Sequence, residues 1–156
     1  DGNVNLFTTA PGKKHSFWIL CEYGIRQNLR MRTRAQLSSF KLNDVTTRGI
    51  ALLQDIQYDL GKVKLTARYA VFDTDDYDNR QYVYENDVLL AYSLPAYHGI
   101  GVRRVVMLEY KLNRQVSFWL RYANTRYPYE ENIGTGPDTV TGNTKNDVKF
   151  QVRIAF

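Results

Sequence analysis

A chain of 156 residues suits one domain, and its 13% aromatic content, with 12 tyrosines, argues against disorder. The single cysteine, Cys21, excludes an intrachain disulfide and a thiolate metal cluster. A net charge of +5 is compatible with nucleic acid, an anionic membrane surface or a charged interior, so composition alone does not choose a partner.

The apolar runs are short. The longest, such as 17–21 and 88–92, fall well below the roughly 20 residues that a membrane-spanning helix needs. The chain begins at Asp1 and carries no signal-peptide pattern. We therefore expect a mature form or a fragment of a longer protein, with residues 1–156 in one domain.

Apolar and polar residues alternate along almost the whole chain. This pattern predicts β-strands, because successive side chains of a strand point to opposite faces of the sheet. Helical spacing fits none of the windows. The predicted strands, about eight in number, cover 17–25, 28–40, 50–60, 62–72, 87–94, 102–112, 115–125 and 146–156.

Turn-forming residues separate these windows, at Gly61, 73–79, 94–99, 112–114 and 134–143. Several windows last about 10–14 residues, whereas strands of soluble proteins usually have about 5–6. A tilted strand needs roughly 9–11 residues to cross a bilayer, so the lengths favour a membrane barrel.

Alternation alone does not say which face lies inside. A soluble barrel turns its apolar face inward, whereas a membrane barrel turns it toward lipid and encloses the polar face. The apolar face here is clean, while the polar face carries large apolar groups that suit a packed interior. Those groups are Trp18, Leu53, Leu89, Val105, Met107 and Trp119.

Tyrosines recur on the apolar face near the ends of the predicted strands. A ring with one polar end suits the boundary between membrane and water. The tyrosines are Tyr23, Tyr58, Tyr69, Tyr92, Tyr110 and Tyr122.

The last strand has apolar residues at every second position and ends on an aromatic residue. It resembles the C-terminal strand of Gram-negative outer-membrane barrels, which the barrel-assembly machinery of that membrane recognises. The residues that match this assembly signal are Phe150, Val152, Ile154 and Phe156, preceded by Val148.

The stretch 69–103, "YAVFDTDDYDNRQYVYENDVLLAYSLPAYHGIGVR", and the ending "GNTKNDVKFQVRIAF" are similar to the C-terminal barrel of Bacteroidetes outer-membrane proteins that often carry helix-hairpin-helix repeats upstream. The resemblance covers about a third of the chain, and the repeats are missing. It implies an outer-membrane location and a barrel, or a segment of a larger barrel, and says little about activity.

The polar face predicts a charged lumen. Its central cluster is Glu22, Arg30, Arg32, Arg34, Asp55, Arg68, Arg103, Glu109, Arg121 and Arg153. In a closed eight-stranded barrel, whose interior is only wide enough for side chains, these charges would pair and plug the lumen. In a larger barrel they would line a channel that favours anions.

The ladder Arg30, Arg32 and Arg34 has three interpretations: an ion-paired wall, a site for an anion or a lipopolysaccharide phosphate, and a nucleic-acid surface. The first is favoured. Nucleic acid would need an exposed basic face with stacking aromatics, whereas this face also carries acids, so we expect no nucleic-acid partner.

Nothing in the sequence predicts catalysis, a metal or a cofactor. A serine hydrolase needs a serine–histidine pair, but His15 and Ser16 are neighbours on a strand and face opposite ways, and His98 lies in a predicted turn. The acidic run 73–79 lacks the glycine and the final glutamate of a calcium loop, and its residues favour turns.

The predicted strands leave one conflict. If the chain end is periplasmic, counting back through eight strands places the acidic loop 73–79 inside and the Gly61 turn outside, the reverse of the usual pattern. A strand missed or merged between 73 and 95 would explain this.

We therefore expect an all-β, antiparallel, up-and-down transmembrane β-barrel of about eight strands, or a segment of one, in the cell outer membrane. Its expected role is structural, as a scaffold or as part of a transport complex, in contact with outer-membrane lipid, the assembly machinery and other envelope subunits. The alternatives are a soluble antiparallel barrel that binds an apolar ligand and an outer-membrane lipid-modifying enzyme.

Overall fold

A computed structural model describes residues 11–134 and 139–156. Within these ranges the chain is all-β and contains no α-helix. The long strands are β1 (Gly12–Arg26), β2 (Leu29–Leu42), β3 (Val45–Asp59), β4 (Val63–Thr74), β7 (Ile100–Lys111), β8 (Val116–Arg126) and β11 (Thr144–Ile154). The short elements are the 3₁₀ turn η1 (Tyr77–Asn79) and the strands β5 (Gln81–Tyr82), β6 (Ala96–Tyr97), β9 (Asn132–Ile133) and β10 (Val140–Thr141).

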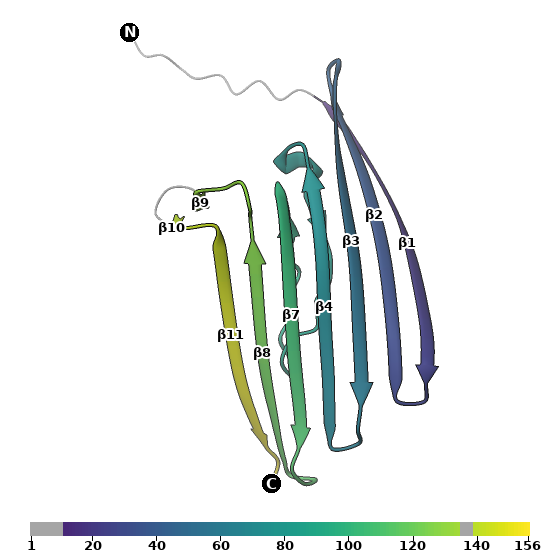
Figure 1. Cartoon of the computed structure of the whole chain (residues 1–156), viewed down its shortest axis with the longest axis vertical. Helices are drawn as coiled ribbons and strands as arrows, with labels where there is room; N and C mark the ends of the chain where they lie inside the picture. The colour runs from purple at the N-terminus through teal and green to yellow at the C-terminus, as the bar shows by residue number, and fades with distance from the viewer. Residues whose placement is uncertain (1–10, 135–138) are drawn as a thin grey trace.

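The seven long strands form one antiparallel sheet in the order β1-β2-β3-β4-β7-β8-β11, so neighbours in the sheet are neighbours in the chain (Figure 1). This confirms the all-β, antiparallel, up-and-down arrangement. Among the described residues β1 and β11 are edges and do not pair with each other, so the sheet is open where a closed barrel was expected.

The predicted strand at 87–94 is wrong. Only an isolated bridge between Glu85 and Ser93 forms there, and the N–H of Ala91 donates to the carbonyl of Val88 in a turn. Leu90 in that turn has a φ of 62°, which an extended strand does not allow. The alternation of 87–94 therefore belongs to a loop, and the long strands number seven.

Residues 75–99 as a whole form an insert between β4 and β7. The insert folds back over one face of the sheet, which we call the insert face, and leaves the opposite face uncovered; we call the latter the apolar face (Figure 1). The small hydrophobic core lies between the sheet and the insert. It consists of Ala51, Leu53, Ala70, Phe72, Val83, Tyr97 and Tyr127.

The removal of one strand resolves the conflict over sidedness. The tight turns around 27–28, 60–62 and 112–115 lie at the same end of the sheet as the C-terminus, and the insert and the loop 127–143 lie at the other end (Figure 1). All long connections are thus opposite the chain end. Within the predicted loop 134–143, residues 135–138 lie outside the described residues, and β10 pairs with β9 in a short hairpin.

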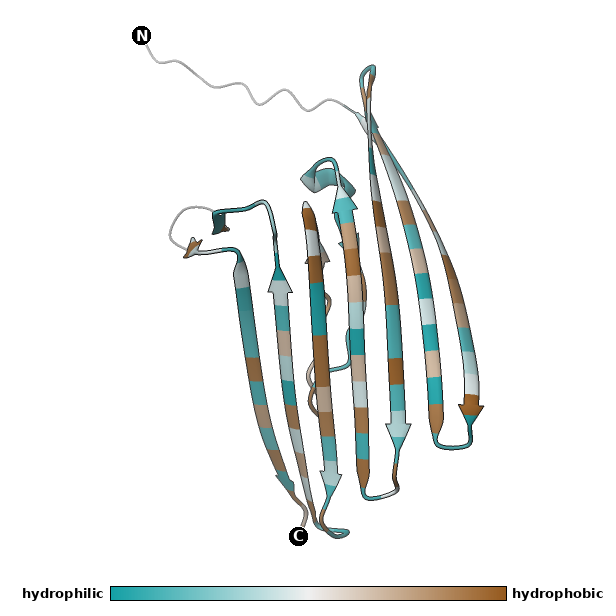
Figure 2. Cartoon of the chain, viewed as in Figure 1, coloured by the Kyte–Doolittle hydropathy of each residue, from teal (hydrophilic) through white to brown (hydrophobic). Residues whose placement is uncertain are grey.

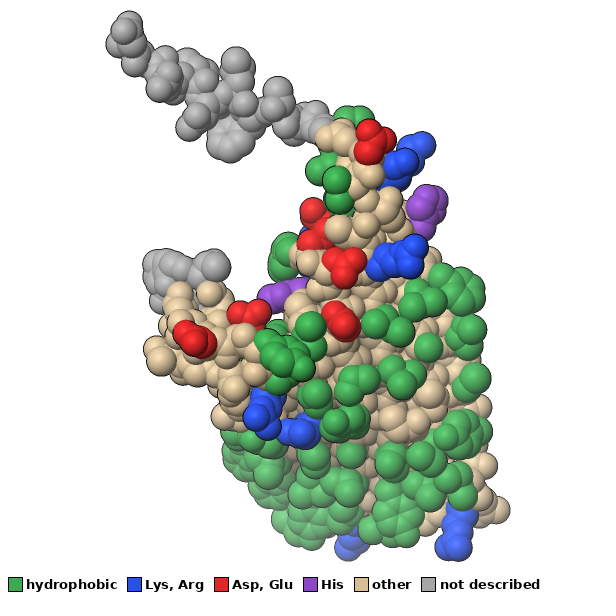
Figure 3. Space-filling view, turned by 45° about the horizontal axis from the view of Figure 1, so that its top comes forward, with side chains coloured by type: hydrophobic (Ala, Val, Ile, Leu, Met, Phe, Trp, Pro, Cys, Tyr) green, Lys and Arg blue, Asp and Glu red, His purple; other side chains and the backbone are tan. Residues whose placement is uncertain are grey.

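The two faces follow the alternation of the sequence, which gives each strand its banded hydropathy (Figure 2). In the space-filling view hydrophobic side chains cover a broad area over the strands, while charged side chains gather above and below it (Figure 3). The side chains of the apolar face that stay exposed include Phe17, Ile19, Leu37, Ile50, Leu52, Ile56, Leu65, Val106, Leu120, Val148 and Phe150.

Candidate functional site

The insert starts with a turn that β3 fixes. The N–H of Asp75 donates to the carbonyl of Arg48 at 2.9 Å, and Asp75 Oδ2 accepts from the N–H of Arg48 at 2.8 Å. Asp76 then caps η1, because its carboxylate accepts from the N–H of Asn79 at 2.9 Å. Both acids thus bind backbone groups, the ordinary role of aspartate in turns.

A buried polar contact follows the turn. Asn79 has no exposed surface, and its amide donates to Thr47 Oγ1 at 2.6 Å while its Oδ1 accepts from Ser38 Oγ at 2.9 Å. Gln81 Nε2 donates to the same Ser38 oxygen at 2.6 Å. Buried polar groups are stable only when they are hydrogen-bonded, so these contacts fix the insert over β2 and β3.

An apolar contact lies next to it. Tyr97 stacks on Phe72 of β4 with ring centroids 5.0 Å apart, and Tyr127 meets the same ring edge-on at 5.9 Å. Val83 fills the remaining space and is 2% exposed. Aromatic pairs of this geometry add about 0.5–1.5 kcal/mol to the burial of their surface.

The insert fits because the sheet beneath it carries small side chains. Ala51, Ala70 and Ala123 are fully buried on the insert face. Gly49 is the closest approach: a Cβ there would lie 2.8 Å from the carbonyl oxygen of Asn79 and 2.9 Å from Ser38 Oγ. Glycine therefore makes room for the insert at this point of β3.

Glu85 is the centre of the polar contacts. Its Oε1 accepts from Tyr97 Oη and from Arg103 Nε, both at 2.6 Å. Its Oε2 accepts from Arg103 Nη2 at 2.8 Å and from Arg121 Nη2 at 2.7 Å. The carboxylate is fully buried, so its oxygens are committed to holding the insert against β7 and β8.

The charge of Glu85 is retained in spite of its burial. Desolvation opposes ionisation, but the hydrogen bonds and charges of Arg103 and Arg121, together with the hydroxyl of Tyr97, outweigh it and lower the pKa of Glu85 below its ordinary value. The same contact raises the pKa of Tyr97, whose burial and acidic neighbour both oppose loss of the phenolic proton.

A second carboxylate extends the contact to the last strand. Asp87 Oδ2 accepts from Lys149 Nζ of β11 at 2.6 Å, and its Oδ1 lies 3.8 Å from Arg121 Nε. Arg121 also reaches Asp147 at 3.3 Å and the carbonyl of Asn86 at 3.2 Å. Burial opposes the ionisation of Asp87, but the Lys149 hydrogen bond helps to hold its pKa below the ordinary value.

A third contact joins the insert to β3 and β4. Arg68 forms a two-pronged pair with Asp55, with Nε and Nη2 at 2.6 and 2.7 Å from the carboxylate oxygens. The remaining prong, Nη1, donates to the carbonyl of Tyr84 at 2.7 Å. An arginine that is locked by a carboxylate in this way presents a rigid donor to the insert backbone.

The predicted charge cluster lies on one face. The register places Glu22, Arg32, Asp55 and Arg68 side by side across β1 to β4. The remaining members lie on the same insert face, as alternation requires: Arg30, Arg34, Arg103, Glu109, Arg121 and Arg153.

These residues differ in how they are paired. Arg121 and Glu85 form a buried ion pair, and the pairs Arg103–Glu85 and Arg68–Asp55 are partly buried. Glu22 and Arg32 pair at 2.8 Å with both side chains 47% exposed, and Glu109 lies 3.4 Å from Lys111.

Arg34 and Arg30 lie toward the β1 edge. Arg34 donates to Gln36 and lies over the ring of Trp18, but its Nε is buried without a partner. Arg30 forms no hydrogen bond or ion pair with any described residue. Pairing is therefore dense under the insert and sparse toward β1, where Trp18 and Leu20 also stay exposed.

Sequence reasoning missed Glu85, the residue that holds Arg103 and Arg121. The sequence carries no signal for its burial, because Gln81 and Glu85 are polar, whereas a core-facing row of a strand is apolar. In the structure Gln81, Val83 and Glu85 are buried while Tyr82 and Tyr84 are exposed. This period of two shows an extended segment that lies flat on the sheet.

The C-terminal strand and the predicted tyrosines fall on the apolar face, with one exception. Phe150, Val152 and Ile154 are exposed there, and Phe156, which follows the end of β11, is exposed as well. Tyr92 is the exception, because it lies in the insert and meets the ring of Tyr84 at 5.3 Å.

The two histidines lie in different surroundings. His98 lies in the insert between the rings of Tyr77 and Tyr127, and burial lowers its pKa. His15 lies on the apolar face of β1. In the described ranges no three side chains of His, Cys, Asp or Glu gather as a metal-binding group.

No family model, curated protein or solved structure matches the chain. Over residues 11–134 and 139–156, no helix has the length and apolar character needed to cross a membrane.

Proposed function

We propose that the chain forms part of the wall of a bacterial outer-membrane β-barrel, with the apolar face toward lipid and the insert inside as a plug. The observation that carries the proposal is the contrast between the faces. All seven strands expose apolar side chains on one face, while the other face holds the buried ion pairs. Membrane barrels have this polarity.

The height of the apolar band supports a bilayer. On β1 the apolar residues of this face run from Phe17 to Ile25, about 27 Å along a strand. The apolar band of outer-membrane barrels is about 25 Å tall. Tyr58 and Tyr110 lie near the tight-turn end, as an aromatic belt at that boundary requires, and Tyr69 lies in the middle of its strand.

The sidedness of the loops supports the same membrane. Outer-membrane barrels keep short turns on the periplasmic side and long loops outside. Three tight turns here share one end with the C-terminus, while the insert, the loop 127–143 and the short turn between β2 and β3 share the other, so both long connections lie opposite the chain end. In the proposed orientation Phe156 lies on the periplasmic side, where the assembly machinery would bind the terminal strand.

The open edges suggest that the wall is larger than seven strands. Bacterial single-chain barrels have an even number of strands, and free strand edges are not tolerated in lipid. Trp18 and Leu20 of β1 lie on the insert face and stay exposed. In a closed barrel, further strands or further lumen residues would cover them. We therefore infer that the seven strands are a segment of a larger barrel.

The role we infer is structural, as a scaffold or as a plugged member of a transport complex, with no enzymatic function. The ion pairs of Glu85 and Asp87 hold the insert in the lumen, which favours a closed wall over an open pore. A soluble carrier of an apolar ligand is less well supported, because such a barrel encloses its apolar face, whereas the insert here covers the polar one.

The natural cysteine tests the orientation. Cys21 is exposed on the apolar face in the middle of β1. In lipid vesicles a water-soluble maleimide should label it at least about tenfold more slowly than in detergent-free denaturant, since hydrocarbon excludes the reagent. The control is Cys21→Ser combined with Asn113→Cys, which places the thiol in a tight turn and should react freely. Rapid labelling of Cys21 in the folded, vesicle-bound protein would rule out the lipid-facing orientation.

A further inference from the structure

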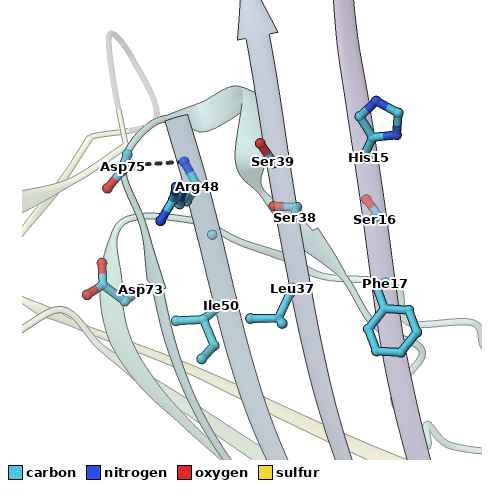
Figure 4. Close-up of a pocket in the computed structure, with 11 residues that line it drawn as sticks. His15, Ser16, Phe17, Leu37, Ser38, Ser39, Arg48, Ile50, Asp73 and Asp75 are labelled. Atoms are coloured by element: carbon cyan, nitrogen blue, oxygen red, sulfur yellow. Dashed lines mark hydrogen bonds between the residues drawn. The ribbon is translucent and has the colours of Figure 1, made fainter. Parts of the chain in front are cut away.

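The apolar face carries a groove of about 550 Å³ at the loop end of β1, β2 and β3 (Figure 4). Its lower part consists of Phe17, Leu37 and Ile50, which are direct neighbours across the three strands. All three are about half exposed, at 60%, 50% and 49%. The groove therefore offers an apolar floor to a molecule outside the barrel.

The next row of the sheet is polar. His15, Ser39 and Arg48 are direct neighbours across the same strands, one row closer to the loop end. Two residues along a strand correspond to about 7 Å, so the apolar floor changes to hydrogen-bonding groups within that distance. Such a step is typical of the boundary between hydrocarbon and lipid headgroups.

Two carboxylates complete the groove. Asp75 already accepts from the N–H of Arg48, as the dashed line in Figure 4 marks, and the guanidinium of Arg48 forms no ion pair with any described residue. Asp73 is the neighbour of Ile50 at the end of the apolar row, and its side chain likewise has no ion pair within the described ranges. One cation and one carboxylate thus face the groove on adjacent rows.

We propose that this groove binds one lipid whose headgroup carries both a phosphate and a primary amine. The phosphate lies at Arg48, His15 and Ser39, the ammonium group lies at Asp73, and an acyl chain lies along Phe17, Leu37 and Ile50. A purely anionic headgroup leaves the Asp73 carboxylate unpaired, and an uncharged headgroup leaves both Asp73 and Arg48 unpaired. Arginine and a phosphate form strong charge-assisted hydrogen bonds.

This inference rests on the proposed function, because a groove on the apolar face meets lipid only if that face lies in a membrane. The test uses the full chain in detergent, titrated with dioleoylphosphatidylethanolamine, dioleoylphosphatidylglycerol or dioleoylglycerol, and native mass spectrometry counts the bound lipid. We expect the ethanolamine lipid to bind about tenfold more tightly than dioleoylglycerol, the difference that about one charge-assisted pair supplies.

Three variants separate the groove from general surface charge. Arg48→Ala should lower the affinity for both phospholipids about fivefold or more, and Asp73→Asn should lower the affinity for the ethanolamine lipid alone. Lys41→Ala is the matched control: it removes a cation from the same face, in the row beyond Ser39 and outside the groove, and should leave both affinities unchanged.

Equal losses for Arg48→Ala and Lys41→Ala, no effect of Asp73→Asn, or equal binding of dioleoylglycerol would each overturn the inference. Heat-modifiable gel migration confirms that each variant is folded. If Cys21 is shielded in vesicles and the groove shows no lipid preference, the site inference alone fails. If Cys21 reacts freely, the proposed function fails as well.

Discussion

At the scale of single residues, a few carboxylates on the insert side each pair with more than one cation of the insert face. Glu85 alone accepts from Tyr97, Arg103 and Arg121, and it is fully buried. Breaking a buried ion pair by removing one partner leaves an uncompensated charge and costs far more than losing an exposed pair. The exposed pair Glu22–Arg32 therefore holds little of the structure, although it belongs to the same face.

Replacing Glu85 should loosen the insert. Glu85→Gln removes the charge that two arginines share, and we expect a loss of about 3–5 kcal/mol in unfolding free energy. Denaturant unfolding in detergent, followed by tryptophan fluorescence, measures it. Glu22→Gln is the control and should cost no more than about 1 kcal/mol. Equal effects of the two substitutions would show that Glu85 does not anchor the insert.

Low pH should also loosen the insert, because protonation removes the charge of Glu85 as Glu85→Gln does. Because the folded pKa of Glu85 is lowered, the unfolded state binds more protons, and the stability that Glu85 contributes rises with pH. The contribution is complete above the unfolded value of about 4.3 and is lost as pH falls through the lower folded value. Hydrogen exchange of the insert amides should accelerate in that range, and Glu85→Gln should remove the step. Exchange that is independent of pH in the wild type, after correction for intrinsic rates, would contradict this.

The sequence predicts which charged residues lie on the insert face, but it does not predict Glu85, which pairs with two of them. Alternation assigns Arg68, Arg103 and Arg121 to one side, because a strand's period fixes the side of every residue. It cannot tell which acid meets which arginine, since Glu85 comes from a segment without regular structure. Pairing of this kind is a property of tertiary structure, and 18 residues separate Glu85 from Arg103 along the chain.

At the scale of elements, the strands follow the sequence and the insert does not. Seven of the predicted windows became strands because their alternation continues over nine or more residues. The window 87–94 is shorter, ends at Pro95, and contains polar groups with stronger partners on β8 and β11 than a strand neighbour offers. This short alternating window therefore forms a loop fixed by long-range ion pairs, and for this reason the predicted number of strands was one too high.

The fit between β3 and the insert should depend on Gly49. Gly49→Ala puts a methyl group 2.8 Å from the carbonyl oxygen of Asn79, so the insert must shift, at a cost of about 1–3 kcal/mol. Limited proteolysis of residues 75–99 reports the change. Gly24→Ala in β1 is the control, because its added methyl would have no neighbour closer than 3.9 Å, and it should leave the proteolysis rate unchanged. Unaltered proteolysis of Gly49→Ala would mean that the contact is not tight in solution.

At the scale of the whole molecule, the open sheet and the apolar face require surroundings that the described residues do not contain. A free edge of 15 residues at β1 is a site for strand addition. A face with this many exposed apolar side chains marks an interaction surface, and we propose lipid. The sequence predicted the meander, but closure depends on strand number and stagger, which alternation does not encode.

The last residue provides a test of assembly apart from stability. Phe156 is fully exposed, so Phe156→Ala should leave refolding into detergent unchanged. In cells it should reduce the heat-modifiable outer-membrane fraction severalfold, because the terminal aromatic is the expected contact for the assembly machinery. Tyr129→Ala removes another exposed aromatic, in the loop 127–143, and should have no effect. Normal assembly of Phe156→Ala would remove the terminal residue from the proposed signal.

The direct pairing of β4 with β7, from Val63 opposite Tyr110 to Asp73 opposite Ile100, makes the sheet continuous without residues 75–99. The seven-stranded sheet and the insert are thus separate modules of one chain. A short hairpin in place of the insert would preserve every backbone ladder of the seven-stranded sheet while emptying the interior, so new contents can be grafted at this junction without redesigning the long strands.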